Sequence, residues 1–252
     1  MPYPFKKKVL EAVIFSSLLY GCETWLAADF KEVERLYISA VKAVLGVRET
    51  TRNDTTLIEA GMPSVQQIIK RRTTNFLKKE LNSGRIQDTP LLKIYKLCEV
   101  KRTKGYIFLS QLLQPSMQQE TSVVEKFRIK NTSKARTYRT INPNMTVHKA
   151  YTSQEYIDER ERLSFTRFRL GSHHLKIETG RWARIEAENR VCNCGGGIQD
   201  EHHVLFTCQK TESERRKFGV NELENDDIGV MMDVMDVHKV ISFVHSCMKH
   251  FK

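Results

Sequence analysis

Residues 192–208 have the sequence C-N-C-G-G-G-I-Q-D-E-H-H-V-L-F-T-C. Thiolate and imidazole are the ligands that a tetrahedral zinc ion prefers in proteins. Three glycines directly follow the first cysteine pair, and glycine lets the backbone turn tightly beside a metal ion. The stretch therefore predicts a structural zinc site whose ligands are Cys192, Cys194, Cys208 and either His202 or His203.

The second half of this stretch predicts a short helix. An acidic Asp200-Glu201 pair opens it, and an apolar run, Val204 to Phe206, continues it. Side chains five residues apart point in different directions on an α-helix. We therefore expect the helix to end or unwind between the histidine and Cys208.

The cysteines admit two other interpretations. A disulfide requires an oxidising compartment, whereas the chain shows no secretory signal. Ordinary buried cysteines would not need to gather with histidine and glycine in so short a segment. The spacing favours zinc, although the first pair is separated by one residue where zinc sites commonly have two.

The stretch also resembles the C-terminal cysteine–histidine motif of LINE-type (non-LTR) retrotransposon reverse transcriptases. In that family an arginine precedes the first cysteine pair, an acidic segment precedes the histidine, and an arginine-bearing helix follows the last cysteine. Here Arg190 stands before Cys192, and Arg215 and Arg216 follow Cys208. The resemblance places the family histidine on His203.

Two more segments carry the same resemblance. Residues 20–25, Y-G-C-E-T-W, resemble the segment at which these enzymes pass from palm to thumb. Residues 168–171, F-R-L-G, and 180–182, G-R-W, resemble the approach to the cysteine–histidine motif. The likeness covers most of the chain and is loose between residues 85 and 155.

The resemblance implies the thumb and C-terminal domain of a reverse transcriptase, as a truncated copy without endonuclease or palm. Such a piece would grip template RNA and target DNA during target-primed reverse transcription, and would not be catalytic alone. The Asp226-Asp227 pair does not change this expectation, because it stands in an acidic turn rather than between hydrophobic strands. A zinc-stabilised protein-interaction module is the alternative.

Composition agrees with a polyanionic partner. The 252-residue chain has a formal net charge of +11 and a pI of about 9.4. Such an excess of positive charge favours nucleic acid. The apolar runs are too short to span a bilayer. We expect a nuclear or cytoplasmic protein in a reducing compartment, neither secreted nor bound to a membrane.

Hydrophobic periodicity predicts a mainly α fold. We expect a thumb-like helical region at 1–84, an irregular helical and basic linker region at 85–152, and a helical C-terminal domain at 153–252 with a zinc knuckle at 190–218. The helices are predicted at 6–22, 29–45, 54–60, 64–83, 91–98, 106–113, 153–170, 210–218 and 229–250. The first is apolar around much of its circumference, so it should be buried.

Basic side chains are the predicted nucleic-acid contacts, although a basic helix face is often merely solvated. The set is Lys70, Arg71, Arg72, Arg181, Arg184, Arg190, Arg215 and Arg216. The loop histidines, His173 and His174, are not needed to complete the metal site.

Three aromatic residues admit two interpretations each. Tyr20 and Trp25 are functional aromatics or, as we expect, core residues at a helix corner. Tyr138 lies in the basic linker predicted at 126–149, where it stacks on a base or, as we expect, is solvated.

Overall fold

The fold is mainly helical, as predicted. The computed structural model describes residues 1–25, 29–82, 97, 100–101, 122–129, 136–223 and 225–251. Within these ranges the only β-type pairing is an isolated bridge between Val191 and Ile198. The helices predicted at 91–98 and 106–113 lie outside the described residues, apart from Leu97.

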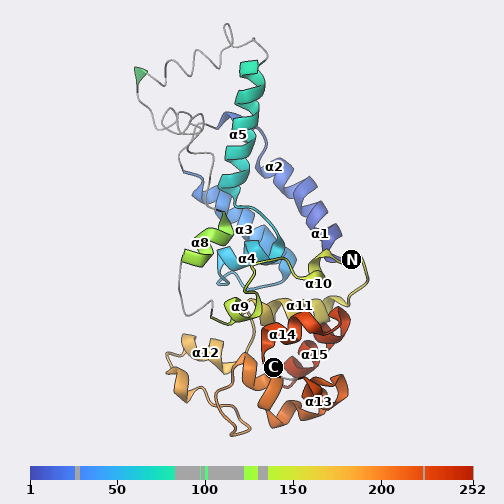
Figure 1. The fold of residues 1–252 in the computed structure, drawn as a ribbon. Helices are drawn as coiled ribbons and strands as arrows, with labels where there is room; N and C mark the ends of the chain where they lie inside the picture. The colour runs from blue at the N-terminus through green and yellow to red at the C-terminus, as the bar shows by residue number, and fades with distance from the viewer. Residues whose placement is uncertain are drawn as a thin grey trace.

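The first part of the chain forms a group of helices in the upper and middle parts of Figure 1. A continuous helix comprises α1 (Tyr3–Val9), a π-helical segment (Leu10–Phe15) and α2 (Ser16–Leu18). A short 3₁₀ turn at Cys22–Thr24 follows it. The remaining helices are α3 (Lys31–Leu45), α4 (Asn53–Ala60) and α5 (Val65–Asn82).

The ends of these helices follow the sequence signals. Gly46 and Gly61 adopt left-handed backbone conformations, φ 72° and 62°, directly after α3 and α4. Glycine is favoured there because it has no Cβ. Ser64 and Gln67 form a reciprocal capping box, in which the Gln67 N–H donates to Ser64 Oγ and the Ser64 N–H donates to Gln67 Oε1. The helices predicted at 29–45, 54–60 and 64–83 are thus confirmed to within two residues at each end.

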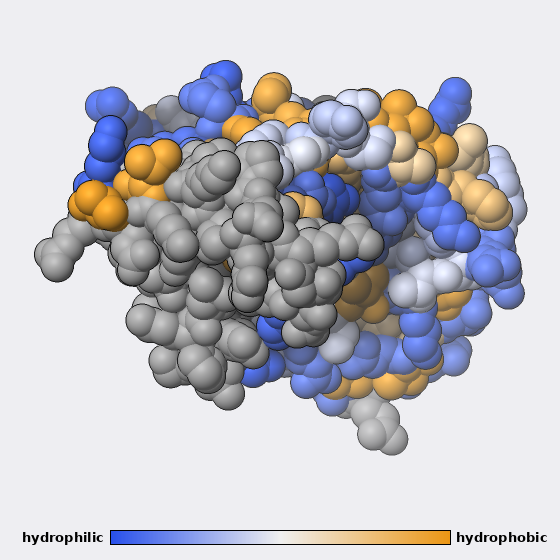
Figure 2. Space-filling view, turned by 90° about the horizontal axis from the view of Figure 1, so that it is seen from above, coloured by the Kyte–Doolittle hydropathy of each residue, from blue (hydrophilic) through white to orange (hydrophobic). Residues whose placement is uncertain are grey.

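The prediction that the first helix is buried is wrong for one of its sides. One side packs into the core, where Phe15 stacks on Tyr37 with ring centroids 4.2 Å apart. Val9, Val13 and Ile14 lie on the other side and are about half exposed. The described residues therefore pack mainly against one side of this helix. Elsewhere too, hydrophobic residues reach the surface among hydrophilic ones, as the view from above shows (Figure 2).

The second part of the chain occupies the lower part of Figure 1. Its α-helices are α8 (Val123–Ile129), α9 (Arg136–Ile141), α10 (Lys149–Thr152), α11 (Glu159–Arg169), α12 (Lys176–Trp182), α13 (Glu212–Phe218), α14 (Ile228–Val234) and α15 (Val237–Lys249). Short 3₁₀ turns lie at Ala187–Asn189, Gln209–Thr211 and Val220–Glu222. A π-helical turn spans His203–Thr207.

Two predicted helices have different bounds in the structure, because aspartate N-caps start helices at positions that hydrophobic periodicity does not reveal. The helix predicted from residue 153 begins at Glu159, because the Asp158 carboxylate accepts hydrogen bonds from Arg160 N and Glu161 N. Ser153 instead ends α10. The helix predicted at 229–250 is divided into α14 and α15, since the Asp236 carboxylate caps the second of them. An Asp N-cap satisfies backbone donors at a helix start.

The prediction of a basic linker is also wrong within the described residues. Residues 122–129 and 136–152 form helices and turns that pack on the core. Tyr138 is buried, so it is neither solvated nor able to stack on a base. Its hydroxyl donates to Glu59 Oε2 at 2.9 Å. By contrast Tyr20, which we expected in the core, is 84% exposed, and Trp25 is half-buried beside Phe30.

One core joins the first and last predicted regions. Its central polar contact is an ion pair between Glu59 of α4 and Arg169 of α11, both almost completely buried. Arg169 uses its Nε and Nη2 groups on the two carboxylate oxygens, a bidentate arrangement that suits guanidinium and carboxylate. A second link is the hydrogen bond from Arg48 N to Ser172 Oγ, 3.0 Å long.

Removing one partner of the buried pair should destabilise the fold. We expect Glu59→Gln to lower the free energy of unfolding by about 3–5 kcal/mol, because Arg169 would retain an uncompensated buried charge. Denaturant unfolding measures the effect. Glu32→Gln is the control, because Glu32 pairs with Arg35 at an exposed site and should cost under about 0.5 kcal/mol. Equal losses for the two variants would contradict the role given to this pair.

Candidate metal centre

The first ligand pair lies in a tight loop closed by main-chain hydrogen bonds. Cys192 N donates to Gly197 O at 2.7 Å, and Gln199 N donates to Arg190 O at 2.9 Å. Gly195 and Gly197 have positive φ values of 79° and 133°, which residues with a Cβ rarely adopt. The glycine triplet therefore folds the chain back within seven residues, as the sequence predicted.

The second pair is brought together by a π-turn. Helix formation starts where the Asp200 side chain accepts the His203 N–H at 2.8 Å. The helix then widens, and Cys208 N donates to His203 O, also at 2.8 Å. This bond between residues five apart defines a π-turn, a feature frequent at functional sites. The backbone becomes extended at Cys208, φ −67° and ψ 129°, so the expected unwinding occurs between His203 and Cys208.

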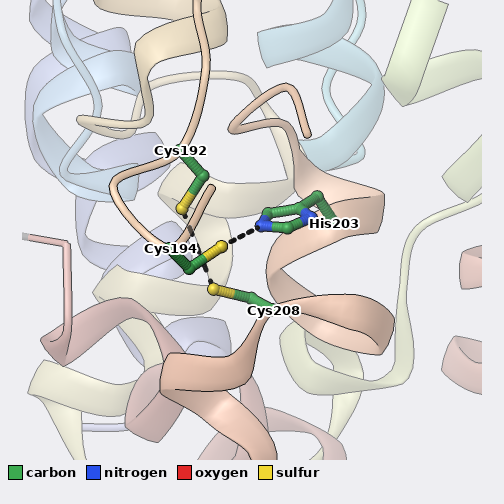
Figure 3. Close-up of side chains that lie close together, drawn as sticks. All are labelled: Cys192, Cys194, His203 and Cys208. Carbon is green, nitrogen blue, oxygen red and sulfur yellow. Dashed lines mark hydrogen bonds between the residues drawn. The ribbon is translucent and has the colours of Figure 1, made fainter. Parts of the chain in front are cut away.

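The four predicted ligand side chains meet at one point (Figure 3). Their candidate ligand atoms all lie within 4.8 Å of one another. Cys194 Sγ lies 3.2 Å from His203 Nε2, and Cys192 Sγ lies 3.8 Å from Cys208 Sγ. Cys192, His203 and Cys208 are buried, and Cys194 is partly exposed. The group can hold a metal ion between its atoms.

Hydrogen bonding distinguishes His203 from His202. His203 Nδ1 lies 2.9 Å from Thr207 Oγ1, which leaves Nε2 facing the sulfur atoms. Metal-bound histidines commonly use their second ring nitrogen in this way, because the bond fixes tautomer and orientation. His202 is exposed, and its Nε2 lies 2.9 Å from Asp226 O. The structure therefore presents His203 as the histidine of the cluster.

The thiols ionise unequally in the absence of a cation. Burial raises the pKa of Cys208 to about 12, and the neighbouring sulfurs add to the rise. Burial also opposes ionisation of Cys192 and Cys194, but hydrogen bonds hold the pKa of each below its ordinary value. One such bond is donated by Gly196 N–H to Cys194 Sγ at 3.4 Å. Three adjacent sulfurs can all be thiolates only when a cation compensates their repulsion.

Side chains around the cluster fix it to the rest of the domain. Arg190 donates from Nη1 to Ile177 O at 2.8 Å and from Nη2 to Ile185 O at 2.6 Å. A Cβ on Gly180 would approach the Arg190 side chain to 2.8 Å, which explains the glycine at that position. Arg190 therefore stabilises the loop.

A buried pair lies on the other side of the π-turn. His173 Nε2 is 3.0 Å from Glu201 Oε1, and both side chains are almost fully enclosed. Burial opposes ionisation of Glu201, but its contact with His173, together with further hydrogen bonds, lowers the pKa of the carboxyl group. His173 is thus engaged away from the four ligands. Sequence reasoning missed this contact, because neither spacing nor a known pattern relates residues 173 and 201.

The predicted nucleic-acid side chains differ in their contacts and exposure. Arg72 donates to Leu19 O at 3.2 Å, and Arg215 is buried and donates to Thr211 Oγ1 at 2.9 Å, so these two and Arg190 make internal contacts. Arg181 and Arg216 pair with Glu178 and Glu212 on their own helices. Arg71, Arg184 and Arg216 are exposed and Lys70 is partly exposed.

These basic residues do not form one patch. Helix α5, with the basic run 70–72, lies at the top of Figure 1, whereas α12 and α13 lie at its lower left and lower right. The Asp226-Asp227 pair has structural roles, since Asp227 caps α14 through a 2.9 Å bond from Val230 N.

Comparison of the chain with known protein families, with curated proteins and with solved structures gave no match. Among the described helices, none combines the length and apolar character that crossing a membrane requires.

Exchanging each histidine separately tests the ligand assignment. We expect His203→Ala to bind much less metal per chain than the unaltered protein, because one of four ligands is lost. His202→Ala is the matched control and should retain the full amount. Elemental analysis of purified protein gives the ratio. The assignment is wrong if His202→Ala loses the metal and His203→Ala retains it.

The orienting bond from Thr207 gives a second prediction. Thr207→Val removes the oxygen that faces His203 Nδ1 while leaving a side chain of similar shape. We expect metal affinity to fall about 10- to 100-fold, as for other partners of metal-bound histidines. Competition with a chromophoric chelator measures the affinity. Unchanged affinity would show that Thr207 does not orient the ring.

Proposed function

We propose that residues 190–218 form a structural zinc knuckle. The observation that supports it most directly is the convergence of three sulfurs and one imidazole nitrogen within 4.8 Å. Three cysteines and a histidine are a common ligand set for structural zinc. Because all four tetrahedral positions would be filled by protein, the ion would stabilise the fold and leave no position for a reacting water.

We further propose that the chain binds nucleic acid, as the C-terminal portion of a LINE-type reverse transcriptase would. The net charge of +11 and the exposed basic residues Arg71, Arg184 and Arg216 support this proposal. The order of the segments 20–25, 168–182 and 192–208 supports the family resemblance. In an intact enzyme this portion would hold template RNA and target DNA while another part carries out polymerisation.

A protein-interaction module is the second candidate. The observation in its favour is the apolar stripe of Val9, Val13 and Ile14, which stands about half exposed on the first helix. Exposed apolar residues arranged along one helix face are typical of surfaces that contact another polypeptide. In this candidate the zinc knuckle would serve as a scaffold only.

Metal analysis tests the zinc knuckle. We expect about one equivalent of zinc per chain and loss of that zinc in Cys208→Ser. Less than about half an equivalent, unchanged by the substitution, would overturn the knuckle. Because metal binding supplies on the order of 10 kcal/mol of folding free energy to small zinc units, a chelator should unfold residues 190–218 before the other helices. Hydrogen exchange with and without chelator measures this order.

A salt titration distinguishes the two candidate functions. If the chain binds RNA or DNA through phosphates, the logarithm of the binding constant should fall linearly and steeply with the logarithm of salt concentration. The full zinc-loaded chain is titrated with a labelled RNA and a labelled DNA of the same sequence. Absence of binding at low salt would favour the protein-interaction module.

A further inference from the structure

A small cavity lies between two segments that are far apart in sequence. One wall is the turn between α3 and α4, and the other is the end of α11 together with α12. Its volume is about 200 Å³. Pockets that enclose a whole drug-sized ligand are commonly about 300–1,000 Å³, so this cavity suits a compact chemical group. The lining residues that matter here are Arg48, Thr51, Gly171, Glu178, Arg181 and Trp182.

Arg48 crosses the cavity between its two walls. Its Nη2 donates to Gly171 O at 3.1 Å, and its Cζ lies 4.4 Å from the centre of the Trp182 ring. Nε and Nη1 of the same guanidinium are enclosed, and neither has an acceptor among the residues that the structure describes. An enclosed cationic N–H group without an acceptor is costly, so each such group requires an explanation.

Thr51 is a second enclosed donor at the same place. Its side chain is more than nine-tenths buried, and Oγ1 has no hydrogen-bond partner within the described parts of the chain. Thr51 and Arg48 both line the cavity, on the wall formed by the turn between α3 and α4. An acceptor with several oxygens would satisfy both residues together.

The charge of the cavity favours an anion as that acceptor. Among the described residues Glu178 is the only acid that lines it, and Glu178 already pairs with Arg181 at 3.3 Å. Arg52, another lining residue, pairs with Asp54. Burial lowers the pKa of Arg48, and the attraction of Glu178 opposes this change only in part. Arg48 is therefore the lining cation that lacks a close carboxylate in the described structure.

Trp182 gives the site a second recognition element. Its indole is 60% exposed, although Arg48 covers one face of the ring. An exposed tryptophan beside a cationic site is suited to stacking of a nucleobase, and such stacking tolerates any base. The small cavity and the open ring thus match two adjacent parts of one ligand, an anionic group and an aromatic group.

We propose that this cavity binds one phosphate group of single-stranded nucleic acid and that the adjoining nucleobase stacks on Trp182. This inference rests on the proposed nucleic-acid function and specifies a site for it. In this proposal Arg48 and Thr51 donate to the phosphate oxygens. A single strand is required because the bases of a duplex are stacked on each other and cannot present a face to the indole.

Tryptophan fluorescence reports the stacking directly, because the chain has two tryptophans. In the Trp25→Phe background Trp182 is the single fluorophore. The zinc-loaded full chain is titrated with inorganic phosphate, a nucleoside, its 5′-monophosphate and a single-stranded oligonucleotide. We expect the oligonucleotide and the monophosphate to quench fluorescence, and the oligonucleotide to bind most tightly. A nucleoside that binds as tightly as its monophosphate would overturn the phosphate contact, and absence of quenching would overturn the stacking.

Variants assign the binding to the cavity. In oligonucleotide binding measured by anisotropy we expect Trp182→Ala to weaken affinity about tenfold, Trp182→Phe to restore most of it, and Arg48→Gln to weaken it at least as much. Arg35→Gln removes an equal charge from an exposed site on α3 and should have little effect. Thermal unfolding confirms that each variant is folded. Affinities of Trp182→Ala and Arg48→Gln equal to that of Arg35→Gln would overturn the site.

The outcome separates this inference from the proposed function. Steep salt-dependent binding that survives both cavity substitutions would overturn the site and leave the nucleic-acid function intact. Absence of binding to any RNA or DNA would overturn both, while the zinc content would still test the knuckle. Binding of a phosphopeptide more tightly than the oligonucleotide would overturn the choice of ligand.

Discussion

The π-turn bond between Cys208 N and His203 O determines the geometry of the whole C-terminal unit. In a regular α-helix these two side chains would diverge, because five residues exceed one turn. Widening the turn by one residue places both on the side that faces the glycine loop. The loop itself contributes few apolar groups, so the segment 190–200 gains its order from main-chain bonds and from Cys192 and Cys194, two of the four candidate ligands. Lys176, the first residue of α12, donates from Nζ to Val191 O and to Asn193 Oδ1, both at 2.7 Å, and thereby attaches α12 to this loop.

Buried polar contacts attach this unit to the rest of the molecule. His173 meets Glu201 next to the π-turn, while four residues earlier Arg169 meets Glu59 on α4. Both pairs extend from the same short segment at the end of α11. A buried guanidinium such as Arg169 is stable only with a partner, and His173 is held by its contact with Glu201, so the segment is fixed on two sides. The same segment presents Gly171 and Leu170 to the cavity that contains Arg48. A displacement of α11 would therefore alter the metal centre, the core and the cavity together.

The sequence was informative where a local rule determines the structure. Gly46, Gly61 and the Ser64–Gln67 box end or begin helices because their preferences depend on a few neighbouring atoms, and the same holds for the glycine loop beside Cys194. It was uninformative where distant residues decide. Tyr138 reads as part of a polar, basic segment, yet it is buried because Glu59 offers an acceptor 79 positions earlier. The apolar pattern of the first helix predicts burial of Val9 and Val13, yet both are about half exposed. Predicting either outcome requires knowledge of which elements meet.

The arginines show most clearly why charge counts overstate a binding surface. Arg162 and Arg169, seven residues apart, lie on the buried side of α11, whereas Arg160 and Arg167, also seven apart, lie on its exposed side. A spacing of seven residues is close to two helical turns, so each pair shares a face. The buried pair serves the fold by compensating Glu159 and Glu59. Composition counts all four alike as attraction for a polyanion. Only the direction of each side chain separates a cation that holds the protein together from one that a phosphate can reach. On this criterion an arginine with unsatisfied donors, such as Arg48, is stronger evidence of a ligand site than an exposed arginine is, because water already satisfies the donors of the exposed side chain.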